Sequence, residues 1–165
     1  MKRSILLRFC GAFLFVALMG APAAQARNRS CSQAGVAGKW GYTYTGTIIL
    51  PTGAIPTASV GRFTLDEAGN ISGTQTRSVN GSVAEEIIKG KGTVNADCTA
   101  TYKVDVYDGA GILLRSAVLA GVFVDKAREL RLIFASLVVL PSGTSIPTVI
   151  TVDAKRLFDE EEDED

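Results

Sequence analysis

Residues 40–50 read WGYTYTGTIIL, and large apolar side chains alternate here with small polar ones. One face of this stretch carries Trp40, Tyr42, Tyr44, Ile48 and Leu50. The other face carries Thr43, Thr45 and Thr47. A period of two residues is that of a β-strand, because successive side chains of a strand point to opposite sides. The stretch therefore predicts a strand with one face in a core.

Similar segments follow this strand at near-regular spacing. They cover about residues 58–66, 71–79, 83–94, 99–107, 112–124, 129–139 and 146–158. Turns rich in Gly, Asn, Asp or Pro separate almost every pair, and Asn80-Gly81 is a favoured two-residue hairpin signal. Residues 112–124 are apolar on both faces, which also fits a helix, but their flanking turns favour a strand. The pattern predicts an all-β protein, an eight-stranded antiparallel up-and-down barrel, with a two-sheet β-sandwich as the alternative.

The first 26 residues have the composition of a secretion signal. Basic residues at positions 2, 3 and 8 precede an apolar run over 13–19, and Ala24-Gln25-Ala26 matches a small-x-small cleavage site. The run is shorter than the roughly 20 residues that a membrane span requires. We therefore expect a cleaved signal peptide at 1–26, a secreted or periplasmic protein, and no membrane span in the mature chain.

Charge is distributed unevenly along the rest of the chain. Residues 159–165 are all acidic, which predicts a disordered tail behind a single barrel domain at 27–158. The body of the domain carries a mild positive charge that is spread over alternate strands. We therefore expect no nucleic-acid partner, since such partners require a clustered basic surface.

Two cysteines remain after cleavage, Cys31 and Cys98, and in an exported domain such a pair most often forms a disulfide. The first, third, fifth and seventh strands of a meander begin at the same end of the barrel. Cys31 precedes the first strand and Cys98 precedes the fifth, so the topology brings them to one end. The last strand also finishes at this end, where we expect Arg156 to lie over Trp40.

The triplet Gly38-Lys39-Trp40, together with Arg156 near the end of the last strand, resembles the signature of the calycins: lipocalins, fatty-acid-binding proteins and avidins. The resemblance implies that Trp40 closes the barrel floor and that Arg156 packs across it, as a structural pair. Cys31 ahead of the triplet is similar to avidin, which also has one internal disulfide. The chain departs from avidins in having a single Trp, and from lipocalins in lacking a Thr-Asp-Tyr-type motif. The resemblance therefore implies a barrel and no particular ligand.

Inward-facing side chains decide whether the barrel is filled or hollow. If the Trp40 face points inward, the candidate ligand-binding residues are Tyr42, Tyr44, Phe63, Tyr102 and Phe134. The third strand has no fully apolar face. Its Ile71 face would bring Gln75 and Arg77 into the barrel, where Arg77 would need a partner such as Glu86. The opposite orientation leaves Arg77 in water and is favoured for that reason.

Two connecting segments are near repeats, LPTGAIPT at 50–57 and LPSGTSIPT at 140–148. In a closed barrel they would be neighbours at the end opposite the cysteines, exposing Ile55, Pro56, Ile146 and Pro147 as mouth loops. They could frame a pocket mouth or a docking surface for a protein partner. They could equally serve only as turns that blunt the strand ends.

The sequence lacks the usual catalytic sets. It contains no His, so it has neither a Ser–His or Cys–His pair nor a His metal site, and it has no Gly-rich phosphate loop. The adjacent Glu85 and Glu86 point to opposite faces of a strand, which argues against paired carboxylates. We therefore expect no catalytic residue, no metal and no cofactor, and we favour a non-enzymatic protein over the open alternative of a barrel that catalyses through the shape of its interior.

Two functional hypotheses follow. The first is a barrel that binds a small apolar or amphipathic ligand in its interior or at its mouth. The alternative is a filled barrel that acts as a structural or protein-interaction module, and a cavity of a few hundred Å³ would favour the first. An outer-membrane barrel is a third hypothesis, opposed by outward charges such as Arg62 and Lys103.

Overall fold

The computed structural model describes residues 31–157. The expected signal peptide and acidic tail lie outside these residues. The elements are α1 (Gln33–Val36), β1 (Gly38–Leu50), β2 (Gly53–Leu65), β3 (Asn70–Val79), β4 (Ser82–Val94), β5 (Thr99–Tyr107), β6 (Leu113–Val124), β7 (Glu129–Val139), β8 (Thr144–Ser145) and β9 (Thr148–Arg156).

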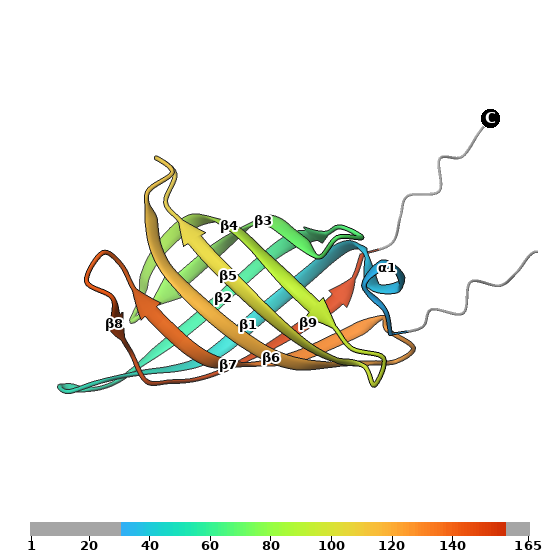
Figure 1. Ribbon diagram of the computed structural model, residues 1–165. Coiled ribbons are helices and arrows are strands. Elements are labelled where there is room, and N and C mark those ends of the chain that lie inside the picture. The colour runs from blue at the N-terminus through green and yellow to red at the C-terminus, as the bar shows by residue number, and fades with distance from the viewer. Residues whose placement is uncertain (1–30, 158–165) are drawn as a thin grey trace, which may run out of the picture.

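The long strands close into a barrel (Figure 1). From β1 to β7 each strand pairs antiparallel with the next, and β9 joins β7 to β1. The β6–β7 and β1–β9 ladders complete the ring, and the two-residue β8 only extends the edge of β7. The prediction of an eight-stranded up-and-down barrel is confirmed, and the sandwich is excluded because every long strand has two neighbours.

The β1–β2 hairpin is longer than the sequence pattern predicts. Pairing continues to its tip, where Leu50 lies opposite Gly53, so that β2 begins five residues before position 58. Ile55 and Pro56 therefore lie within a strand and not in a mouth loop. Ile146 and Pro147, in contrast, lie in the connection between β8 and β9. The first residues of β2 were not predicted as strand because proline, here Pro56, cannot donate to a ladder and normally marks its end.

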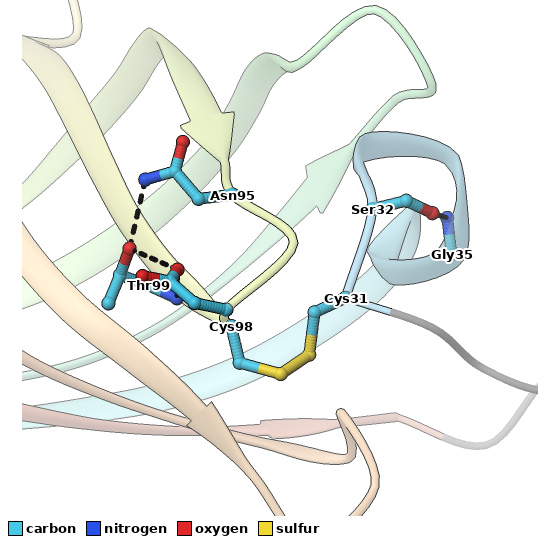
Figure 2. Close-up of a disulfide and its surroundings, with 7 residues drawn as sticks. Cys31, Ser32, Gly35, Asn95, Cys98 and Thr99 are labelled. Carbon is cyan, nitrogen blue, oxygen red and sulfur yellow. Dashed lines mark hydrogen bonds between the residues drawn. A yellow bond between two sulfur atoms is a disulfide. The ribbon is translucent and has the colours of Figure 1, made fainter.

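A short helix, α1, lies at one end of the barrel (Figure 1), and the disulfide is found at the same end. The Ser32 hydroxyl caps α1 by accepting a hydrogen bond from the Gly35 amide at 3.1 Å. Figure 2 shows the disulfide between Cys31 and Cys98, which ties the segment ahead of α1 to the turn between β4 and β5. The predicted cysteine pairing is confirmed. The four-residue helix was not predicted, since it is too short for a helical period to show.

Trp40 lies beneath α1 and seals this end. Its side chain is fully buried, and its indole Nε1 donates to the Val36 carbonyl at 3.2 Å. The Arg156 guanidinium lies 5.4 Å from the centre of the indole, and its Nη2 donates to the Gly35 carbonyl at 3.1 Å. Phe63 and Phe123 pack on the indole from inside, at 6.2 and 5.7 Å between ring centres. Side chains therefore fill this end of the barrel, and the open part of the interior lies between it and the opposite end.

Candidate functional site: a cavity with a charged wall

The barrel encloses a cavity of about 380 Å³. Most of its wall is aliphatic or aromatic. The structure places all of the candidate ligand-binding residues on this wall, namely Tyr42, Tyr44, Phe63, Gln75, Arg77, Tyr102 and Phe134. Of the mouth residues Ile146 lines the cavity, whereas Ile55, Pro56 and Pro147 do not.

Aromatic rings from three strands line one side of the cavity. Tyr44 of β1 meets Phe134 of β7 edge to face at 5.7 Å, and Tyr42 of β1 meets Phe63 of β2 at 5.8 Å. Such tilted pairs are a favourable geometry for aromatic rings. These side chains reach the interior because each occupies an inward position in the alternation of its strand.

Tyr102 lies on β5, and its ring rests against the backbone of Gly92 on β4. A Cβ atom at position 92 would collide with the ring, so this position requires glycine. The Tyr102 hydroxyl is buried and has no hydrogen-bond partner among the described residues. Buried hydroxyls normally have a hydrogen-bond partner. This group can donate a hydrogen bond to a water or to a polar atom of a ligand, or accept one from it.

The orientation of the third strand, β3, is opposite to the one favoured from the sequence. β3 turns its Ile71 face inward, so that Gln75 is buried and Arg77 is half-buried. Glu86 of β4 makes this possible: its side chain is only 1% exposed, and its Oε1 accepts from Arg77 Nε at 2.9 Å. The outward orientation is wrong because a buried carboxylate offsets the cost of burying the guanidinium.

Gln75 connects this ion pair to the aromatic wall. Its Nε2 donates to Glu86 Oε2 at 2.7 Å, and its Oε1 accepts from the Tyr42 hydroxyl at 2.7 Å. Ser59 also donates to Gln75 Oε1, at 3.4 Å. A continuous network of hydrogen bonds therefore crosses four strands, β1 to β4, and fixes the positions of its members.

Arg115 of β6 is the residue that sequence reasoning missed. Its Nη1 donates to Glu86 Oε1 at 2.8 Å and its Nη2 donates to Glu86 Oε2, a two-pronged contact that spans β5. It was missed because residues 112–124 are apolar on both faces and give no clear alternation. Once Phe123 is known to face inward, counting back in twos reaches Arg115.

The network controls the ionisation of its members. Burial disfavours the charged form of Glu86, but the hydrogen bonds and charge of Arg115, with the hydrogen bonds of Gln75 and Arg77, outweigh it. The pKa of the Glu86 carboxyl is therefore held below its ordinary value. Burial raises the pKa of the hydroxyls of Tyr42, Tyr44 and Tyr102, which stay protonated at neutral pH.

A pH dependence of stability follows from Glu86. Since its folded pKa lies below the ordinary value of 4.5, the stabilisation is present above about pH 4.5 and is lost as the pH falls through the folded pKa. Protonated Glu86 then resembles glutamine. We expect the unfolding free energies of wild type and Glu86→Gln to differ most at pH 7 and to differ less at pH 3, measured by urea denaturation. The exposed neighbour variant Glu85→Gln is the control, and a wild type–Glu86→Gln difference that is unchanged between the two pH values would contradict this assignment.

The mouth lies at the end opposite α1, where Figure 1 shows β8. We call the segments at 49–57 and 140–148 the two lips of the mouth. They are in contact, since the Ile49 amide donates to the Pro147 carbonyl at 2.9 Å. Ile55 pairs with Ile48 across the β1–β2 hairpin. Ile55 and Ile146 are half-buried and not exposed as expected, because each packs at the edge of the barrel. The hydrogen bond between Ile49 and Pro147 agrees with the predicted adjacency of the two repeats.

Residues 31–157 lack the features of two other kinds of site. This part of the chain contains no group of three or more Cys, Asp or Glu side chains that could hold a metal ion. Nor does it contain a helix with the length and apolar composition needed to cross a membrane.

Comparison with known proteins bears on the fold. No protein-family model matches the chain, and no curated protein matches it significantly. Among solved structures it is similar to EF1p2_mFAP2b bound to DFHBI, with a TM-score of 0.52 and 13% sequence identity over 78% of this chain and 100% of that chain. The comparisons thus assign no family, and they support the conclusion that this chain is an eight-stranded β-barrel with the fold of a barrel solved with a bound ligand.

Proposed function

We propose that this protein binds a small apolar or amphipathic molecule inside its barrel. The observation that carries the proposal is the cavity of about 380 Å³, whose wall is mostly apolar and carries a few fixed polar groups. Small-molecule sites have this character and begin at about 300 Å³. An eight-stranded barrel can instead be filled by its own side chains. The volume of the cavity favours ligand binding over the filled-barrel alternative.

Two further observations support the proposal. The similar barrel EF1p2_mFAP2b was solved bound to DFHBI, which gives a precedent for a ligand in a barrel of this fold. The unpartnered Tyr102 hydroxyl offers a polar contact on a wall that is mostly apolar. The ligand-binding residues are then the seven cavity residues predicted from the sequence, and Arg115 supports them by holding Glu86.

The disulfide supports a setting for this function. Structural disulfides persist in oxidising compartments. The Cys31–Cys98 bond therefore supports a secreted or periplasmic protein, in line with the signal peptide expected at 1–26. A protein partner at the lips is a separate hypothesis that no contact in the structure favours over the ligand.

Native mass spectrometry of the protein purified gently from its own source tests the proposal directly. We expect an adduct of about 150–250 daltons, the mass of a molecule that this cavity can hold, which disappears when the protein is denatured. A bare native mass, together with no binding of any apolar probe, would contradict the proposed function.

Filling the cavity should abolish binding. Ala117 on β6 is buried, lines the cavity and lies opposite Val104 and Leu137. We expect Ala117→Trp to place an indole in the cavity and to weaken ligand binding at least tenfold, measured by titration calorimetry. The matched control is Ala120→Trp, because Ala120 is exposed on the outer face of the same strand. Equal loss of binding in both variants, or in neither, would argue against binding in the cavity.

A further inference from the structure

The charge on the cavity wall has one sign. Among the described residues, the charged side chains that line the cavity are Arg77 and Arg115, and Glu86 is not among the lining residues. Two guanidinium groups therefore share one carboxylate, which leaves a surplus of one positive charge beside the cavity. An unmatched charge in a partly dry site is costly, and it is stabilised by an anion.

The hydrogen bonds show which arginine carries the surplus. Glu86 accepts four hydrogen bonds, two at each carboxylate oxygen. Both terminal nitrogens of Arg115 donate hydrogen bonds to this carboxylate. Arg77 spends only Nε, and its two terminal NH₂ groups have no hydrogen-bond partner among the described residues. Arg77 thus has free the planar pair of donors that suits a carboxylate.

The location of Arg77 sets the orientation of a ligand. It lies two residues before the end of β3, and Arg115 lies two residues after the start of β6, so both are near the mouth. The Arg77 side chain is 22% exposed. A charged head group there would keep part of its hydration, while an apolar body extended towards Phe63 and Leu130 in the interior.

The size and wall of the cavity limit the apolar body. A volume of about 380 Å³ equals roughly a dozen water volumes of about 30 Å³ each. A ligand that fits has on the order of a dozen non-hydrogen atoms by this measure. The rings of Tyr44 and Phe134 offer edges and faces to a second aromatic system.

We propose that the cavity selects small monoanions, with an apolar or aromatic body of this size and one carboxylate that binds the free guanidinium edge of Arg77. This inference rests on the proposed ligand-binding function and names the chemical class of the ligand. Arg115 acts here as a positioning residue, because it neutralises Glu86 and so leaves the terminal nitrogens of Arg77 available.

The test compares probes of one shape and different charge by titration calorimetry at pH 7. The probes are 2-naphthoate, the neutral 2-naphthalenemethanol and the cationic 2-naphthylmethylammonium. We expect naphthoate to bind at least tenfold more tightly than the alcohol, since a hydrogen bond between charged groups is stronger than a neutral one. The cation should bind more weakly than the alcohol.

Arg77→Gln isolates the contribution of the guanidinium. Glu86 keeps its contacts with Arg115 and Gln75 in this variant, so we expect it to fold, and the ratio of its affinities for naphthoate and the alcohol is the readout. The preference for naphthoate should fall to about onefold. Arg62→Gln is the matched control, because Arg62 is exposed on the outer face of β2 and its loss changes the net charge equally.

The outcomes separate the two proposals. Equal affinity of wild type for naphthoate and the alcohol would overturn the anion inference and leave the ligand-binding function standing. A preference that survives in Arg77→Gln, or that is lost equally in Arg62→Gln, would also overturn it. Binding of none of the three probes would count against the proposed function itself.

Discussion

Replacing Glu86 with alanine is expected to lower the free energy of unfolding by about 3–5 kcal/mol. The carboxylate is almost fully buried and is the common partner of Arg77, Arg115 and Gln75. Its removal leaves two guanidinium groups side by side without a counter-charge. The expected cost comes mainly from these abandoned charges and less from the loss of favourable contacts.

Urea denaturation at pH 7 measures this effect. The matched control is Glu85→Ala, because Glu85 is adjacent in sequence but exposed on the outer face of β4, and we expect it to change stability by less than about 0.5 kcal/mol. The double variant Glu86→Ala/Arg115→Leu should recover part of the loss, since it removes one abandoned charge. A Glu86→Ala variant as stable as Glu85→Ala would show that the network contributes little to the fold.

Removing the disulfide is expected to lower the free energy of unfolding by about 4 kcal/mol. The two cysteines are 67 residues apart, so the bond excludes many extended conformations of the unfolded chain. It also holds the segment ahead of α1, and with it the helix that covers Trp40. We expect Cys31→Ser/Cys98→Ser to unfold at a clearly lower urea concentration than wild type.

Reduction provides the control for this experiment. A phosphine reductant should shift the unfolding midpoint of wild type close to that of the double variant. The same reductant should leave the double variant unchanged. If wild type kept its midpoint after full reduction, as verified by its mass, the bond would have no role in stability.

The alternation of side chains carried most of the fold prediction. Residues 40–50 alternate cleanly, and the structure follows them with Trp40 and Tyr44 buried. The cysteine pairing was predictable for a related reason, because parity in a meander fixes the end at which each strand starts. The hairpin tip at 50–53 and the four residues of α1 were not, since neither leaves a periodic signal.

The cavity wall was predictable only in part. The aromatic residues could be assigned from the inward face of their strands. The orientation of β3 could not, because the cost of burying Arg77 depends on Glu86 and Arg115, which lie on other strands. When β3 is considered alone, its Arg77 is predicted to point into water. Three strands considered together show that the charge is matched inside, and that the match is incomplete.

The sealed floor has a kinetic consequence. Trp40, α1 and the disulfide leave the mouth as the route for any molecule that exchanges with the interior. Entry and release then cross the same barrier at the mouth, beside which the Ile49 amide is bonded to the Pro147 carbonyl. Changes at Ile49 or Pro147, which do not line the cavity, would alter both rates by the same factor and leave the equilibrium affinity unchanged. Residence time and selectivity are therefore controlled by different parts of this barrel, the lips and the charged wall.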